Sequence, residues 1–347
     1  DNDTIDDVLG YFDIPSRKIV NLRRVGAPFI SNRVIAFSTG TYFSYFDFQT
    51  QQIIDTQVKH AYGSLAVDND KIAFLTGESS LGEDLNGDGD TSDYIVRYYD
   101  ITLKQVFNTS AESTRYAYPI IAGNIIVFVT SEAVVGLAGE DLNGDGDKLD
   151  NVVRYYNIST GNIVNTRAET ISTVPATSRN IIAFLTYEGS VGLSGMDLNG
   201  DADKYDKIVR YYDVALGTIG NTGERANEDS VNVSNNIIAF ATVESGIGRN
   251  GVDVNGDGDK NDNIVRYVIV GGELPTFPPV ASFTATPTSG SAPLAVQFTD
   301  KSTGKIDSFQ WDFGDGQTST EKNPSHTYTS PNTYSISLTV SNTAGSA

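Results

Sequence analysis

The sequence predicts an all-β protein in which residues 1–272 form a tandem repeat of short strands and residues 280–347 form a second β domain. A strand-like segment centred on Val-Arg-Tyr-Tyr or a degenerate form of it recurs along the chain, beginning at Val8, Tyr42, Ile95, Val152, Ile208 and Ile264. The segments between these markers are rich in Val, Ile, Phe and Tyr and are bounded by Asn, Gly and Asp turns. Helical periodicity is missing throughout.

The spacing of this repeat predicts a β-propeller. Successive markers lie 34, 53, 57, 56 and 56 residues apart, measured between Asp13, Asp47, Asp100, Asn157, Asp213 and Ile269. A fixed period of about 55 residues with four strands per unit is typical of propeller blades, which bury their faces only against neighbouring blades. With the strands of each blade named A to D, the sequence offers five A, five B, six C and five D strands. We therefore predict five blades.

This strand count raises the question of how the ring closes. Because the chain starts with a C and D pair, we expect the N-terminal segment to supply the outer strand of the last blade and so remove an unpaired edge. One C strand is then left over, either residues 8–14 or residues 264–270. A strand added to a neighbouring subunit gains main-chain hydrogen bonds, and a head-to-tail contact of this kind builds a filament or lattice. Residues 1–22 are therefore a candidate for subunit joining, with closure within one chain as the alternative.

Four acidic loops lie between strands B and C and would project from one face of the propeller. Each has Asp, Asn, Asp, Asp and Asp at relative positions 1, 3, 5, 7 and 10, with Gly at position 4. Short oxygen-bearing side chains at alternate positions of a bent loop can converge on a hard cation that takes about six to eight oxygens. The candidate metal ligands are Asp84, Asn86, Asp88, Asp90, Asp93, Asp141, Asn143, Asp145, Asp147, Asp150, Asp197, Asn199, Asp201, Asp203, Asp206, Asp253, Asn255, Asp257, Asp259 and Asp262.

Calcium is the predicted ion, at about four per chain. The loops resemble those of EF-hands, dockerins and integrin-type propeller repeats, with which they share the opening D-x-[DN]-x-D-G. They depart from the EF-hand because the closing carboxylate stands at position 10, and because Ala202 replaces the glycine of position 6 in the third loop. We therefore expect calcium binding without EF-hand helices or switching. The alternative is a solvated acidic turn without an ion, in which crowded carboxylates would repel one another.

The character of the sequence changes after Gly272. Residues 273–279 are proline-rich and predict a linker, and the tail carries Ala292-Pro293, the run WDFGDG from Trp311 and the segment HTY from His326. Through these motifs residues 280–347 closely resemble the polycystic kidney disease (PKD) domain, an immunoglobulin-like β-sandwich. We expect Trp311 to fill the core between two sheets, with a ligand platform as the alternative.

The resemblance implies an extracellular protein. PKD modules generally act as extracellular spacers or adhesion units, in archaeal surface proteins and in secreted bacterial hydrolases. The order of propeller and PKD domain resembles surface-layer and other cell-surface proteins of methanogenic archaea. It implies a structural subunit of a surface layer, sheath or filament that self-associates by strand addition or calcium-bridged contacts, with surface glycans as candidate partners. The alternative is a non-catalytic glycan- or protein-binding fragment of a secreted hydrolase.

Composition argues against several other functions. The chain of 347 residues has no Cys, two His and a net charge of −20. We therefore expect no enzyme activity, no zinc site and, without a basic face, no nucleic-acid partner. The sequence contains no apolar run of about 20 residues, so it predicts no membrane span. A start at Asp1 without a leader fits a mature secreted product or a fragment.

Two residue types recur in the C strands. An arginine follows the last Asp of each loop by four positions, at Arg97, Arg154, Arg210 and Arg266. We expect each to bond a nearby carboxylate or carbonyl, with a ring of cations for an anionic glycan as the alternative. The Tyr pairs at 98–99, 155–156 and 211–212 alternate across a strand. We expect one Tyr of each pair to pack between blades and the other to be open to water, rather than a sugar-stacking platform.

Overall fold

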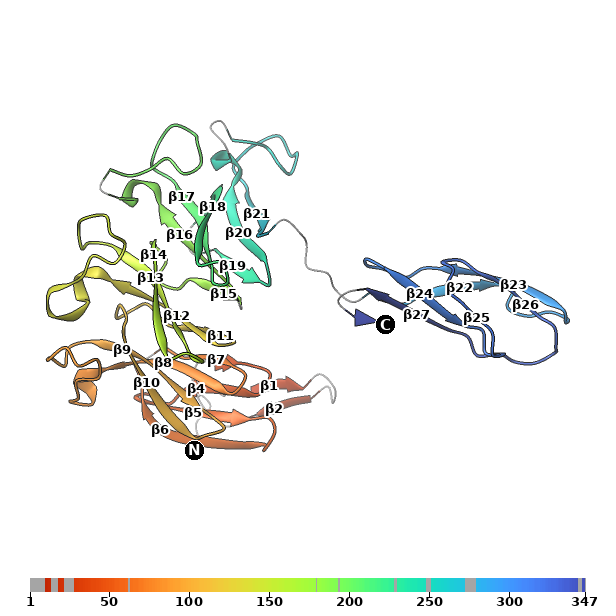
Figure 1. Cartoon of the computed structure of the whole chain (residues 1–347), viewed down its shortest axis with the longest axis horizontal. Helices are drawn as coiled ribbons and strands as arrows, with labels where there is room; N and C mark the ends of the chain where they lie inside the picture. Colours follow the sequence, from red (N-terminus) through yellow and green to blue (C-terminus); the bar gives the residue numbers. More distant parts are fainter. Residues whose placement is uncertain are drawn as a thin grey trace, which may run out of the picture. The chain divides into compact units, whose positions relative to one another are not determined.

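The computed structural model describes residues 10–13, 18–21, 28–61, 63–178, 180–192, 194–227, 230–247, 251–271, 279–342 and 345–346. Two compact units make up the chain, residues 1–272 and residues 273–347 (Figure 1). Within the described ranges the regular structure is β-strand apart from five short 3-10 segments. The predicted linker at 273–279 lies outside the described residues except for Pro279.

The described strands of the first unit form one hairpin and five antiparallel sheets. The hairpin is β1 (Gly10–Asp13) with β2 (Lys18–Asn21). The first sheet is β3 (Pro28–Ile30), β4 (Val34–Ser38), β5 (Tyr42–Asp47) and β6 (Gln52–Lys59). The second is β7 (Ala66–Asp68), β8 (Lys71–Gly77), β9 (Tyr94–Asp100) and β10 (Gln105–Glu112).

The later sheets repeat this plan. The third is β11 (Ile120–Ala122), β12 (Ile125–Ser131), β13 (Asn151–Asn157) and β14 (Asn162–Glu169). The fourth is β15 (Ala176–Ser178), β16 (Ile181–Tyr187), β17 (Lys207–Asp213) and β18 (Thr218–Arg225). The fifth has three strands, β19 (Asn232–Ser234), β20 (Ile237–Val243) and β21 (Asn263–Ile269). The 3-10 segments follow the second strands as η1 (Glu78–Ser80), η2 (Glu132–Val134), η3 (Gly136–Ala138), η4 (Glu188–Ser190) and η5 (Glu244–Gly246).

Strand order agrees with the predicted A to D pattern, but the predicted closure is wrong. Each sheet is a meander in chain order, and the second to fifth sheets carry the long acidic loop between their second and third strands. Within the described residues the last sheet ends at β21 without a fourth strand, and β1 pairs with β2 in a separate two-stranded sheet. Pairing across a four-residue connection costs little loop entropy, so the N-terminal C and D strands pair with each other rather than with the distant β21. Much of the segment proposed for subunit joining, including residues 1–9, lies outside the described residues.

Apolar cores fill the spaces between successive sheets, as expected for propeller blades. Between the first and second sheets, Phe43 and Tyr45 pack against Phe74 and Tyr99. Equivalent clusters join the second sheet to the third, the third to the fourth and the fourth to the fifth. The first strands β3, β7, β11, β15 and β19 contact one another in that order. Residues 28–271 therefore form a succession of packed blades.

Both members of the first two Tyr pairs, at 98–99 and 155–156, are buried, which corrects the expectation that one member would be open to water, whereas in the third pair Tyr212 is buried and Tyr211 is half-buried. Tyr98 and Tyr99 are each 6% exposed. Tyr99 packs toward the first sheet and Tyr98 toward the third, beside Tyr156. Because an inner blade has a neighbour on each face, the alternation of side chains along a strand sends successive rings into two different cores.

The last sheet leaves one face open. Val96, Val153 and Val209 on the third strands of the second to fourth sheets are 0% exposed, whereas Val265 on β21 is 81% exposed and Tyr267 is 61% exposed. Among the described residues, no packing like that between neighbouring blades joins β19 back to β3. The described blades therefore do not close into a ring.

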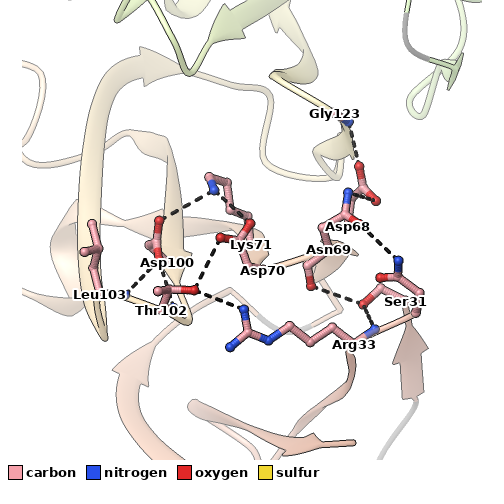
Figure 2. Close-up of polar contacts among 11 residues, drawn as sticks. Ser31, Arg33, Asp68, Asn69, Asp70, Lys71, Asp100, Thr102, Leu103 and Gly123 are labelled. Atoms are coloured by element: carbon pink, nitrogen blue, oxygen red, sulfur yellow. Dashed lines mark hydrogen bonds and ion pairs between the residues drawn. The ribbon is translucent and has the colours of Figure 1, made fainter. Parts of the chain in front are cut away.

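Polar contacts also link successive blades, at the turns opposite the acidic loops. Figure 2 shows Asp68, in the second sheet, whose carboxylate accepts the N–H of Gly123 in the third at 2.6 Å. Arg33 in the first sheet donates to the Thr102 hydroxyl in the second at 3.0 Å (Figure 2). These contacts join three blades independently of the loops.

The second unit is a two-sheet sandwich. One sheet is β22 (Phe283–Thr286), β23 (Leu294–Asp300) and β26 (Ser325–Tyr328). The other is β24 (Ser308–Asp312), β25 (Thr318–Ser319), β27 (Ser337–Asn342) and β28 (Gly345–Ser346). Trp311 is 0% exposed, packs on Phe298 and Phe283, and donates its indole N–H to the Glu321 carbonyl at 2.8 Å. The structural role expected for Trp311 is confirmed.

Candidate metal centre

Each acidic loop is held by a buried glutamate that begins the 3-10 segment after the second strand. These glutamates, Glu78, Glu132, Glu188 and Glu244, are all 0% exposed. In the second loop, Glu132 Oε1 accepts the N–H groups of Leu142 at 2.7 Å and Asn143 at 3.1 Å, and Oε2 accepts the N–H of Asp150 at 3.2 Å. One carboxylate therefore fixes both the start and the end of the loop.

The Asp at position 1 also bonds the loop backbone. Asp141 accepts the N–H of Gly144 at 2.6 Å and of Gly146 at 3.0 Å. The other three loops have the same pair of contacts, from Asp84, Asp197 and Asp253. Glycine suits position 6 because its φ there is positive, +105° at Gly146. In the third loop Ala202 takes a φ of +80°, so the loop keeps its path despite the missing glycine.

Positions 3, 5 and 10 converge on a further glutamate that comes from the fourth strand of the same sheet. In the second loop, oxygens of Asp145, Asp150 and Glu169 all lie within 4.8 Å of one another. The Asn143 side-chain amide donates to Glu169 at 2.8 Å and to Asp150 at 3.0 Å. In the first loop, Asp88, Asp93 and Glu112 form the same cluster.

Position 7 contributes to a second cluster. Oxygens of Asp147, Asp150 and the anchoring Glu132 lie within 4.8 Å of one another, and the equivalent groups come together in the first and third loops. Asp150 at position 10 belongs to both clusters. The structure thus gathers positions 5, 7 and 10 of the predicted ligand set, together with two glutamates that the set did not include.

The pKa values of several of the clustered carboxyl groups are raised above their ordinary values. Burial, followed by the nearby charges of Glu112, Asp90, Asp88 and Glu78, raises the pKa of Asp93 to about 6. Burial likewise raises the pKa of Glu112 and of Glu169. A bound divalent cation would favour the ionised form, so these residues fit a hard-cation site.

The third loop differs because Arg225 stands where Glu112 and Glu169 stand in the preceding sheets. Its guanidinium lies 2.9 Å from the Asp206 carboxylate at position 10. In the part of the chain that the structure describes, the fifth sheet ends at β21, and no fourth strand brings an equivalent residue to the fourth loop.

Among the four repeated C-strand arginines, Arg266 pairs with a carboxylate as expected, and its partner comes from the preceding blade. The Nε atoms of Arg97, Arg154 and Arg210 are buried without a hydrogen-bond partner within the described residues. Arg266 makes a bidentate contact with Glu224, with one N–H···O distance of 3.0 Å. Arg154 lies in the field of Glu112, and Arg210 in that of Glu169, while burial lowers the pKa of both guanidinium groups. These arginines lie between blades rather than on an open face, which argues against the glycan ring.

The two sets of glutamates were missed from the sequence although both carry a repeated signal. The anchoring glutamate is the last residue of a Thr-x-Glu motif, which ends the second strand of every sheet that carries an acidic loop, as in Thr130-Ser131-Glu132. The other closes Asn-Thr-x-x-Glu, as in the segment from Asn165 to Glu169. Both lie outside the loops, and one of them lies far from its loop in sequence, so the loop motif alone could not include them.

None of the helices in the described ranges has the length and apolar character needed to cross a membrane.

Comparison with known proteins identifies the second unit. Residues 276–347 match the family model of the PKD domain. The chain is 44% identical over 63 residues to collagenase ColA of Bacillus cereus, and 42% identical over 67 residues to the pre-pro-metalloprotease PrtV of Vibrio cholerae. These matches cover 17% and 19% of this chain and 7% of each relative, so the chain spans a small part of their length.

The chain also has some structural similarity to the β-propeller domain of the Trilobed protease from Pyrococcus furiosus. The match covers 79% of this chain and 76% of that one, at 10% identity and a TM-score of 0.44. The propeller character of residues 28–271 rests on their own sheet order and packing. The C-terminal residues 276–347 are a PKD domain of immunoglobulin-like fold.

Proposed function

We propose that this chain is an extracellular, non-catalytic module of a secreted hydrolase, which binds a polymeric substrate or tethers the catalytic part to it. The observation that carries this proposal is the PKD domain, which is shared with a collagenase and a metalloprotease. Its two-sheet core is complete around Trp311, so the domain serves as a rigid spacer or docking unit.

Binding of the full chain to polymers in millimolar calcium tests this function. Candidate ligands are a panel of polysaccharides and fibrillar collagen, measured by co-sedimentation and by surface-immobilised binding. Micromolar affinity for one polymer supports the proposal. No binding to any of them, together with ordered assembly of the protein by itself, argues for the second candidate below.

We further propose that the acidic loops bind calcium and stabilise the blades. Support comes from the clustered oxygens of Asp145, Asp150 and Glu169, and from the raised pKa of their counterparts in the first loop. An ion that binds only the folded state stabilises it by mass action. An unfolding temperature that stays constant between excess chelator and millimolar calcium would argue against calcium in these loops.

A self-associating structural protein of the cell surface, part of a surface layer, sheath or filament, is the second candidate. The observation that favours it is the open face of the fifth sheet, where Val265 and Tyr267 are 81% and 61% exposed. Calcium-dependent assembly seen by electron microscopy, abolished by Val265→Lys, would support this candidate. Assembly that depends on residues 1–12 and not on Val265 would instead support joining through the N-terminal segment.

A further inference from the structure

We propose that the four acidic loops are not equivalent: Glu112 and Glu169 complete cation sites in the first two loops, whereas Arg225 occupies the corresponding place in the third. This inference rests on the proposed calcium binding and specifies which loops hold the ion tightly. It assigns a ligand role to two glutamates outside the loops and a counter-cation role to one arginine.

The position of the glutamate is set by a bulge in the fourth strand. Pairing between β13 and β14 shifts register between Val153 and Arg154, where Asn165 is the last residue paired before the bulge. Arg167 in the bulge has a φ of +60°, and Asn165 fixes the bulge to the loop by donating to the Leu142 carbonyl at 2.7 Å. A bulge of this kind re-aims the side chains that follow it, here Glu169.

Glu169 has an oxygen available for a ligand. The residue is 7% exposed, and its Oε2 has no hydrogen-bond partner within the described residues. Its carboxylate lies in the oxygen cluster with Asp145 and Asp150. An unpartnered carboxylate oxygen buried beside two further carboxylates is costly unless a cation is present. This observation is independent of the loop motif and points to a ligand.

The same glutamates connect neighbouring blades. Glu112 accepts the N–H of Gly136 at 3.0 Å, and Glu169 accepts the N–H of Gly192 at 3.1 Å. Both amides belong to the loop of the next sheet. A cation bound through Glu112 or Glu169 would therefore fix the interface between two blades as well as one loop.

In the third loop the charge at this position is reversed. Pairing between β17 and β18 places Arg225 opposite Ile208, as Glu169 is opposite Val152. Arg225 lies 2.9 Å from Asp206, whose side chain is 4% exposed. Exchanging Glu for Arg changes the local charge by two units, and calcium affinity depends on the number of charged ligands. The guanidinium supplies internally the positive charge that the first two loops would obtain from an ion.

Calcium titration of the full chain tests the inference, with native mass spectrometry for stoichiometry and calorimetry for affinity. We expect two tight sites in the unaltered protein, and weaker binding at the other loops. Glu169→Gln should remove one tight site or weaken it at least tenfold. Arg225→Glu should add a third tight site, and Arg225→Gln, which removes the charge with less perturbation, should strengthen binding at that loop.

Lys104→Glu is the matched control, because it makes the same change of charge at an exposed position of the turn between β9 and β10, at the opposite end of the strands from the acidic loops. It should add no site. Four equal sites, or Glu169→Gln and Arg225→Gln proteins that bind as the parent does, would overturn the inference while leaving calcium binding intact. Absence of any calcium binding would instead overturn the proposed function on which the inference rests.

Discussion

Replacing the buried anchor of the second loop should destabilise the first unit strongly. Glu132 is 0% exposed and accepts three backbone N–H groups, from Leu142, Asn143 and Asp150. In Glu132→Ala all three donors lose a charged acceptor. A hydrogen bond to a charged group contributes about 1.5–3 kcal/mol, and removal of the buried charge offsets part of the loss, so we expect a net cost of about 3–5 kcal/mol.

Glu132→Gln separates hydrogen bonding from size. The amide oxygen can still accept from Leu142 and Asn143, but the NH2 group then faces the N–H of Asp150 and one bond is lost. The expected cost is about 1–3 kcal/mol. Glu140→Gln is the control, because Glu140 is exposed in the same loop, and its expected effect is below about 0.5 kcal/mol.

Urea unfolding of the full chain, followed by tyrosine fluorescence of the first unit, measures these differences. In a thermal scan about 2–4 °C is expected per kcal/mol for a unit of this size, so Glu132→Ala should unfold about 10 °C below the parent. Measurements in excess chelator and in calcium separate the anchor from the ion. If Glu132→Ala and Glu140→Gln have the same urea midpoint and the same unfolding temperature, both in chelator and in calcium, the anchoring role of Glu132 is refuted.

Three further predictions follow from the structure. Calcium at about one hundred times the dissociation constant should stabilise the first unit by about 2.7 kcal/mol per independent site, measured as the shift of the urea midpoint relative to chelator. Burial lowers the pKa of His60 from its usual 6.5, so the stability contributed by the neutral imidazole is present above pH 6.5 and is lost as the pH falls through the lower pKa of the folded state. His60→Gln should remove this part of the pH dependence of stability. Identical profiles of stability against pH for the two proteins would contradict this prediction. Trp311→Ala should unfold the PKD domain with a cost of about 3–5 kcal/mol and leave the first unit's transition in place, whereas a loss confined to ligand binding would favour the platform role.

The repeat made most of the strand pattern predictable, because each blade buries its faces only against its neighbours and so carries the same alternation. Val96, Val153 and Val209 occupy equivalent buried positions, and the sequence repeat alone predicts that they are equivalent. Closure was not predictable in the same way. The pattern shows that β1 and β21 are both third strands, but it contains no information about which edge each one meets. Val265 has the same sequence context as its buried counterparts and is nevertheless 81% exposed, since no neighbouring blade covers that face of the fifth sheet within the described residues.

The ligand set was predictable only where it is local. Positions 1 to 10 of each loop are close in sequence, so their convergence follows from a glycine-bent turn. Glu169 joins Asp150 across β13 and β14, and that contact depends on a register shift after Asn165 that no pattern in the loop reveals. The anchoring Glu132 was overlooked for a related reason. Its carboxylate accepts hydrogen bonds from backbone N–H groups, and because every residue except proline carries such a group, the sequence does not show which of them a glutamate will bond.

The end of the fourth strand illustrates how a single position decides the chemistry of a loop. The second and third sheets end their fourth strands with Ala-Glu, and the fourth sheet ends with Glu224-Arg225. Because side chains alternate between the two faces of a strand, moving the glutamate one residue earlier turns it away from its own loop. Glu224 then meets Arg266 of the next blade, and Arg225 faces Asp206 instead. In the earlier blades one glutamate lies near both the loop and the next arginine, whereas here two residues divide those contacts. The fourth and fifth blades are therefore joined by an ion pair at the point where we propose that calcium joins the earlier blades.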